Sequence, residues 1–135
     1  MPKKNDSDRL IEDIKTLCEG LIFVSESDSE LTPIVAEKVS TRSSKAYLAA
    51  LGKANIHFQE TEFEKFFENL IVERDWFDEV ERKQARQFRK LKEYFQKNLG
   101  EPRVFRFGVI KIDIYVVGIA PDGRLIGVKF KAVET

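Results

Sequence analysis

The chain has 135 residues, of which 42% are apolar and 34% are charged, and its 23 basic and 23 acidic side chains cancel to a net charge of zero. This composition is typical of a single soluble globular domain, and zero net charge argues against nonspecific nucleic-acid binding as the main activity. The sequence contains no apolar run of the roughly 20 residues that a transmembrane helix needs, no secretory signal, and too few cysteines for an internal disulfide. We therefore expect a cytoplasmic protein with no membrane partner.

The first 60 residues predict one helix followed by short strands and a second, shorter helix. Apolar residues at helical spacing predict the first helix over residues 8–19, and residues 1–6 are expected to form a flexible tail. The apolar residues 21–24 predict a buried strand, which stops at an acidic loop over residues 25–30. The next elements are expected to be a strand at 34–39, a helix at 43–51 and a strand at 56–58.

Two helices are expected in the middle of the chain. Thr61 is the predicted N-cap of the first, and Asp75 is the predicted N-cap of the longest helix, which ends at Gly100. Apolar side chains recur along this longest helix with a period near 3.6, which predicts one buried face. They are Trp76, Val80, Phe88, Leu91, Phe95 and Leu99.

The last third of the sequence predicts a β meander. Strands are expected at residues 104–107, 110–119 and 125–133, with a tight turn at 121–123 between the last two. Helices followed by a meander indicate an α+β fold, in which helices cover an antiparallel or mixed sheet. In the middle strand, one face is expected to carry Ile110, Ile112, Ile114 and Val116.

Few residues suggest catalysis. Cys18 belongs to the apolar stripe of the first helix, where a buried structural thiol is favoured over a nucleophile. His57 is the sole histidine, so neither a histidine pair nor a His-based metal site can form. The glycines are scattered singly and make no phosphate-binding motif. We expect no enzyme and no cofactor; a carboxylate-based enzyme stays open, although no constellation of acids stands out.

Three stretches of the chain together resemble the nuclease A inhibitor family. The first is GLIFVSES at residues 20–27, and the second is DWF at 75–77. The third is the C-terminal third, with PRVFRFG, DIYVVG and PDG in the same order and VET at its close. The ordered set covers over half the chain, and the total length also fits the family.

The resemblance implies an inhibitor rather than an enzyme. Members of this family plug the active site of a secreted, sugar-nonspecific DNA/RNA endonuclease of the ββα-metal class, and we expect one inhibitor per nuclease. The implied fold is a three-layer α/β/α sandwich with a mostly antiparallel, mixed sheet, similar to that of the pathogenesis-related proteins. It would make residues 1–135 a single inhibitor-like domain.

The resemblance also assigns roles to four residues. Glu26 would take the place of the scissile phosphate in the nuclease centre, and the hydroxyl of Thr135 would bind the catalytic Mg²⁺ of the nuclease. Asp75 and Trp76 would form a second contact. These roles suit the chemistry, because a nuclease centre binds anions with cationic groups and Mg²⁺ prefers oxygen ligands. Each residue also has a purely structural interpretation: a solvated acid, a frayed terminus, a helix cap and a core aromatic.

A second function is suggested by the basic residues of the longest helix. Residues 82–92 carry six lysines and arginines on the faces away from the apolar stripe. The alternative hypothesis is therefore a nucleic-acid-binding module that uses this helix. Basic residues opposite an apolar stripe, however, usually form the solvated side of an amphipathic helix.

Overall fold

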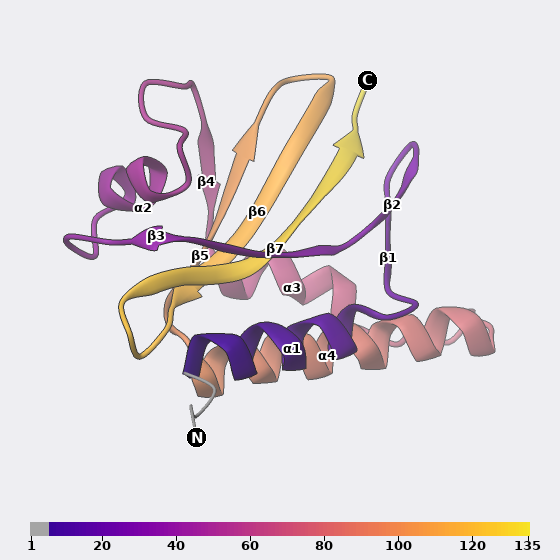
Figure 1. Cartoon of the computed structure of the whole chain (residues 1–135). Coiled ribbons are helices and arrows are strands. Elements are labelled where there is room, and N and C mark those ends of the chain that lie inside the picture. The colour runs from indigo at the N-terminus through magenta and orange to yellow at the C-terminus, as the bar shows by residue number, and fades with distance from the viewer. Residues whose placement is uncertain (1–5) are drawn as a thin grey trace.

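The structure is a computed structural model that describes residues 6–135 (Figure 1). Four helices and seven strands make up this part of the chain. Their order is α1 (Asp6–Cys18), β1 (Ile22–Val24), β2 (Asp28–Glu30), β3 (Thr32–Lys38), α2 (Ser44–Ala50), β4 (Gln59–Thr61), α3 (Phe63–Ile71), α4 (Glu79–Asn98), β5 (Gly100–Phe107), β6 (Lys111–Ile119) and β7 (Arg124–Val133).

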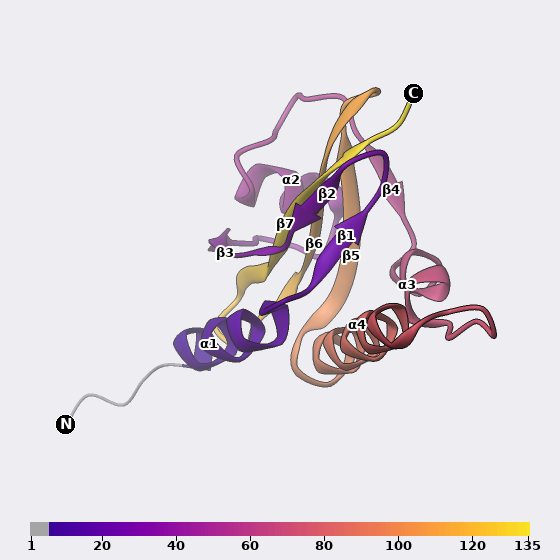
Figure 2. The ribbon, with the colours of Figure 1, turned by 90° about the vertical axis from the view of Figure 1, so that its right-hand side faces the viewer.

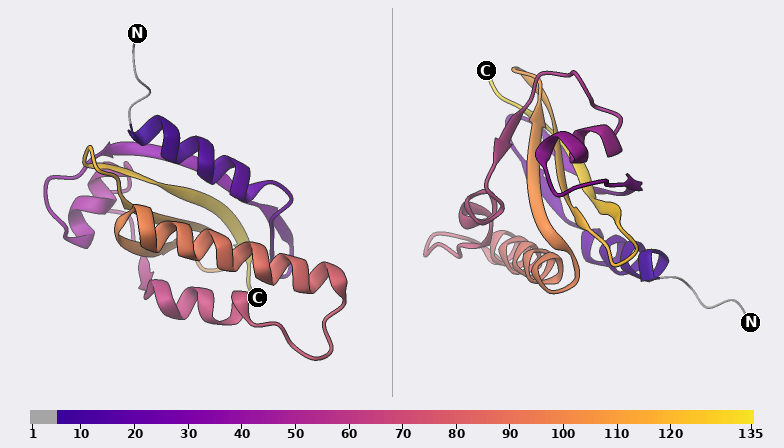
Figure 3. Two further views of the ribbon diagram at one scale, coloured as in Figure 1. Left: turned by 90° about the horizontal axis from the view of Figure 1, so that it is seen from below. Right: turned by 90° about the vertical axis from the view of Figure 1, so that its left-hand side faces the viewer.

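A five-stranded sheet forms the middle of three layers. Its strand order is β3-β7-β6-β5-β4, and every neighbouring pair is antiparallel. Helices α1, α3 and α4 cover one face and α2 covers the other, as Figures 2 and 3 show from the sides and from below. The expected α+β class is confirmed, and the sheet is antiparallel throughout.

Strand β6 supplies side chains to two hydrophobic cores because successive residues of a strand point to opposite faces. Ile112, Ile114 and Val116 are buried against the three-helix side. Val117, on the opposite face, packs in the smaller core beneath α2 together with Tyr47. Ile110 was expected to continue the first row but is 55% exposed, because it lies in the β5–β6 turn before the strand begins.

The N-terminal half of the chain departs from expectation at several points. Asp6 already begins α1, while residues 1–5 of the expected tail lie outside the described residues. The strand expected at 56–58 is wrong, since Ile56 is 45% exposed in a loop. The strand forms three residues later, where Gln59 and Thr61 find partners on β5. Its position is set by that pairing rather than by local apolar residues.

The start of the longest helix is also corrected. Its N-cap is Asp78 rather than Asp75. A carboxylate oxygen of Asp78 accepts a hydrogen bond from the Glu81 N–H at 2.8 Å, and a carboxylate oxygen of Glu81 accepts one from the Asp78 N–H at 3.2 Å. This reciprocal capping box begins α4 three residues later than expected. Asp75 and Trp76 consequently lie in the preceding loop, and the expected N-cap Thr61 is likewise replaced, by Glu62.

Gly127 marks the tightest approach between β7 and β6. A Cβ atom at this position would overlap the carbonyl oxygen of Val116 and lie 2.8 Å from the Cα atom of Val117. We expect Gly127→Ala to lower the free energy of unfolding by about 3 kcal/mol, because backbone atoms cannot yield as a flexible side chain can. Chemical denaturation measures this difference.

Gly100→Ala is the matched control on β5. The nearest atoms to an added Cβ there belong to Ile119 and lie at 3.6 and 3.8 Å, which is ordinary contact. We expect it to change stability by no more than about 0.5 kcal/mol. Equal destabilisation by the two substitutions would contradict this account of the β6–β7 packing.

Candidate functional site

The acidic loop expected at residues 25–30 is largely part of a hairpin. Strands β1 and β2 pair antiparallel, with Val24 opposite Asp28, so that residues 25–27 form the tip. The hairpin lies beside the C-terminal half of β7 (Figures 1 and 2). Strand β3 covers this edge of β7 only as far as Lys129, so the hairpin continues where β3 leaves off.

Two serine hydroxyls attach the hairpin to β7. Ser25 Oγ accepts a hydrogen bond from the Val133 N–H and Ser29 Oγ accepts one from the Lys131 N–H, both at 3.0 Å. The Glu26 N–H donates to the Val133 carbonyl oxygen at 3.2 Å. Backbone groups that a neighbouring strand would otherwise satisfy are thus satisfied by the hairpin. Sequence reasoning missed these bonds, because it treated Ser25 and Ser29 only as polar residues of an acidic loop.

Glu26 and Thr135, from opposite ends of the sequence, meet at the hairpin tip. The Thr135 N–H donates to one carboxylate oxygen of Glu26 at 2.9 Å. The Thr135 hydroxyl proton is shared between the two carboxylate oxygens, at O···O distances of 2.8 and 3.0 Å. Both residues are exposed. Two of the residues predicted to bind a partner therefore form one polar unit, and their role toward a partner stays a prediction.

The residues just before Thr135 are also held in place. The Glu134 N–H donates to the carbonyl oxygen of Ile110 in the β5–β6 turn at 2.9 Å. The Glu134 carboxylate forms an ion pair with Arg106 on β5. The end of the described chain is therefore fixed on one side by the hairpin and on the other by β5 and the turn that follows it. It is ordered by specific contacts rather than frayed.

Asp75 and Trp76 lie in the loop between α3 and α4. The Trp76 side chain is 75% exposed, which excludes the interpretation of a core aromatic. Its ring lies against the Phe77 ring, with centroids 6.3 Å apart, and the Arg74 guanidinium carbon is 5.7 Å from its centre. The Asp75 side chain is also exposed. The loop thus presents an aromatic ring and a carboxylate to solvent.

Basic residues of α4 bind this loop. Arg82 donates from Nε to the Phe77 carbonyl oxygen and from Nη2 to the Asp75 carbonyl oxygen, both at 3.2 Å. Arg86 forms an ion pair with Glu73 at 3.0 Å. Two cationic side chains of the segment 82–92 therefore position the loop that carries Trp76. Sequence reasoning treated them only as a solvated face or a nucleic-acid contact.

The residues singled out for possible catalysis occupy ordinary positions. Cys18 is buried in the core, and burial raises the pKa of its thiol to about 12, which disfavours the nucleophilic thiolate. His57 is exposed in the α2–β4 loop. Residues 6–135 contain no cluster of three or more histidine, cysteine or acidic side chains able to hold a metal ion. Within the same range, no helix is both long and apolar enough to span a membrane.

Comparison with known protein families places the chain in one of them. The family model described as nuclease A inhibitor-like protein matches residues 8–135, nearly the whole chain. The protein belongs to the nuclease A inhibitor-like family. A search of curated proteins finds no match. The family implies an inhibitor of a nuclease, and the match spans both the hairpin with Glu26 and the tail with Thr135.

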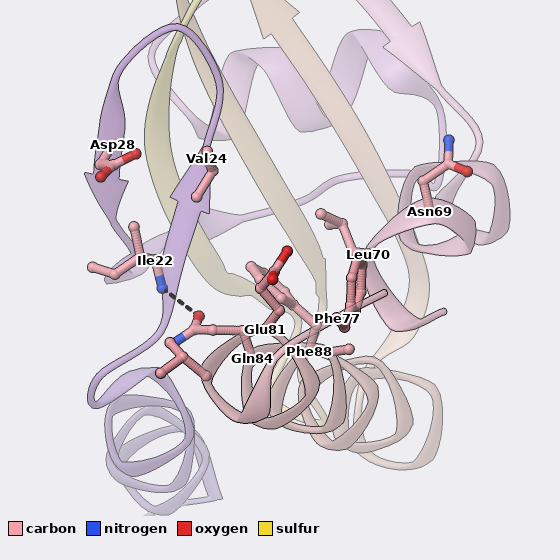
Figure 4. Close-up of a pocket in the computed structure, with 11 residues that line it drawn as sticks. Ile22, Val24, Asp28, Asn69, Leu70, Phe77, Glu81, Gln84 and Phe88 are labelled. Atoms are coloured by element: carbon pink, nitrogen blue, oxygen red, sulfur yellow. Dashed lines mark hydrogen bonds between the residues drawn. The ribbon is translucent and has the colours of Figure 1, made fainter. Parts of the chain in front are cut away.

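A groove separates the two pairs of predicted contact residues in this nuclease A inhibitor-like chain. Its volume is about 410 Å³, and it opens between the β1–β2 hairpin, α3 and the first turns of α4 (Figure 4). Val24 and Asp28, on either side of the hairpin tip, line one wall. Phe77, the neighbour of Trp76, lines another. The site therefore consists of two exposed tips with an open groove between them.

The hydroxyl of Ser25 is expected to hold the hairpin tip against β7. In Ser25→Ala, the Val133 N–H loses its acceptor, and the net cost is expected to be about 1 kcal/mol. Amide hydrogen exchange at Val133 and Thr135 should then be about fivefold faster, because local opening becomes easier.

Ser27→Ala is the matched control in the same tip. No hydrogen bond involves the Ser27 hydroxyl among the described residues, whereas Ser25 Oγ donates to the Ser27 carbonyl oxygen at 3.0 Å. Exchange at Val133 should therefore stay unchanged in this variant. Unchanged exchange in Ser25→Ala as well would show that the serine does not anchor the hairpin.

Proposed function

We propose that this protein inhibits a metal-dependent, sugar-nonspecific DNA/RNA endonuclease of the ββα-metal class by occupying its active site. In this proposal, Glu26 takes the place of the scissile phosphate and the Thr135 hydroxyl binds the catalytic Mg²⁺ of the nuclease. The observation that supports it best is the hydrogen-bonded pair of Glu26 and Thr135 on the exposed edge of a nuclease A inhibitor-like chain.

The chemistry of the pair suits a nuclease centre. Such a centre attracts phosphate with cationic groups and a metal ion, so the Glu26 carboxylate presents a complementary charge. A hydroxyl has one donor and two acceptor positions, and Thr135 uses its proton on Glu26. The lone pairs of its oxygen then stay available to Mg²⁺, which prefers hard oxygen ligands and replaces only some of its waters.

The ordered tail supports tight inhibition. A flexible segment loses conformational entropy when a partner fixes it, and this loss weakens binding. Here the hairpin holds Glu26, Glu26 holds Thr135, and Arg106 holds Glu134 already in the isolated chain. Much of the ordering cost is therefore met during folding rather than on binding.

Asp75 and Trp76 form the second contact in this proposal. Tryptophan is enriched among the residues that dominate interface energies, and the exposed ring of Trp76 has few contacts with its own chain. The arginine bonds to the loop backbone hold it in place before binding. The proposed complex contains one inhibitor and one nuclease, and the inhibitor needs no cofactor of its own. In the cytoplasm it would protect the producer's nucleic acids from a nuclease awaiting export.

Thr135→Val tests the metal contact because it removes the hydroxyl and keeps the shape and the backbone N–H. We expect inhibition of a purified ββα-metal endonuclease to weaken about 10- to 100-fold, which corresponds to the roughly 1.5–3 kcal/mol of an interaction with a charged group. Thr135→Ser keeps the hydroxyl and should inhibit nearly as wild type does. Circular dichroism and thermal unfolding show whether each variant keeps its fold.

The outcomes separate function from mechanism. Stoichiometric inhibition by the wild type with equal inhibition by Thr135→Val and by deletion of Thr135 would retain the function and remove the metal contact. Failure of the wild type to inhibit any of several such nucleases would overturn the proposed function. The alternative, nucleic-acid binding through residues 82–92, then predicts DNA binding that needs no nuclease and falls steeply with salt.

Trp76→Ala tests the second contact. We expect inhibition to weaken about 30- to 1,000-fold, the range that follows from the roughly 2–4 kcal/mol of a typical interface hot spot. Stability should hardly change, since the side chain is 75% exposed. Val35→Ala, at a 43% exposed valine of β3, is the control and should inhibit as wild type does. Equal inhibition by both variants would place Trp76 outside the interface.

A further inference from the structure

The groove between the hairpin and α4 is apolar at both rims. Val24 on β1 and Val80 in the first turn of α4 are each 69% exposed. Leu70 of α3 and Phe77 also line the groove, on the side that faces the hairpin in Figure 4. Scattered exposed apolar residues are normal on a protein surface, but a contiguous, concave apolar surface is typical of an interaction site.

The charged side chains that line this groove are acidic. The chain as a whole is neutral, yet the described residues that line the groove include Asp28 and Glu81 and no lysine or arginine. The side-chain amide of Gln84 also lines the groove, but it already has hydrogen-bond partners. It donates to the Gly20 carbonyl oxygen at 2.7 Å and accepts from the Ile22 N–H at 3.0 Å. An occupant that suits the groove therefore combines an apolar side chain with a neighbouring positive charge.

The groove is continuous with both proposed contacts. Val24 and Asp28 flank the tip that carries Glu26, and Phe77 directly follows Trp76. A nuclease surface that touched both Glu26 and Trp76 would lie across the groove. A nuclease also binds a polyanion, so its surface near the active site carries positive charge that complements the groove's two carboxylates.

We propose that this groove receives a protruding segment of the same nuclease, with an apolar side chain between Val24 and Val80 and a basic side chain beside Asp28 and Glu81. The inference rests on the proposed function and adds a third contact to it. The groove then separates nucleases that the protein inhibits from those that it does not, because the active-site contacts alone would fit any member of the metal class.

Val80→Arg tests the groove with the nuclease that the wild type inhibits. The new side chain fills the rim and repels a cationic segment, so inhibition should weaken at least tenfold, mainly through faster dissociation. Val35→Arg makes the same change on β3 and should inhibit as wild type does. The two unfolding midpoints show whether either substitution disturbs the fold, since both positions are exposed.

Protection of an introduced thiol from alkylation gives a second test of the groove contact, and this test does not depend on an added charge. The sequence has one cysteine, Cys18, and it is buried, so Val80→Cys introduces the one readily alkylated thiol. We expect saturating nuclease to slow its reaction with iodoacetamide at least tenfold. The thiol introduced by Val35→Cys should react at the same rate with and without nuclease.

The outcomes distinguish this inference from the function on which it rests. Wild-type inhibition that Thr135→Val weakens and Val80→Arg does not, with no protection of the thiol, would overturn the groove contact and leave the function standing. Protection of the thiol in concentrated inhibitor without nuclease would assign the groove to a second copy of this chain, and would also overturn the inference. If the wild type inhibits no ββα-metal nuclease, the function fails first, and the groove contact fails with it.

Discussion

The arrangement of the site depends on the uncovered edge of β7. Strand β3 pairs with β7 only through Lys129, and the last residues of β7 therefore have a neighbouring strand on one side alone. Unpaired backbone groups at a sheet edge need partners, and the hydroxyls of Ser25 and Ser29 supply them. Because the hairpin must lie here to provide these bonds, Glu26 at its tip comes next to Thr135. The need of the β7 backbone for hydrogen-bond partners thus brings Glu26 and Thr135 together as the proposed inhibitory unit.

The second contact is likewise held in place by hydrogen bonds between a side chain and backbone groups. The loop between α3 and α4 has no regular structure, and regular backbone bonds therefore do not fix it. Arg82 binds two of its carbonyl oxygens from the neighbouring helix, which holds the loop against α4. The same guanidinium would be the natural candidate for a phosphate contact in a nucleic-acid-binding protein. Its existing bonds give it a structural role that charge counting alone does not reveal.

Local patterns in the sequence predicted most of the regular elements but not their pairings. The amphipathic period of α4 is strong because buried residues such as Leu91 and Phe95 recur on one face, so its existence was evident. Its start was wrong because the capping-box pattern was overlooked: Glu81 follows Asp78 by three residues and forms the reciprocal bond, whereas no Glu or Gln follows Asp75 at that spacing. Strand β2 was missed, since three polar residues form a strand only when a partner lies beside them.

The four candidate residues also show which features the sequence could predict and which depend on the fold. Sequence chemistry alone left Glu26 as a solvated acid and Thr135 as a frayed end, and it was the family resemblance that assigned them a function. Their contact depends on the fold, because residues 109 positions apart meet through the packing of the hairpin on β7. The groove beside them is formed by two strands, two helices and a loop, so no linear motif could have indicated it.

The contact between Glu26 and Thr135 is compatible with binding to a nuclease in its present form. An internal hydrogen bond that had to break first would subtract from the affinity. The Thr135 hydroxyl uses its donor on Glu26, and a metal ion needs its acceptor side, so the two interactions do not compete. Because the hydroxyl proton points toward the Glu26 carboxylate, an approaching cation would meet the oxygen lone pairs rather than the proton. The pair can therefore meet a metal centre as one preformed unit, whose negative charge and oxygen ligand are already in place before the nuclease arrives.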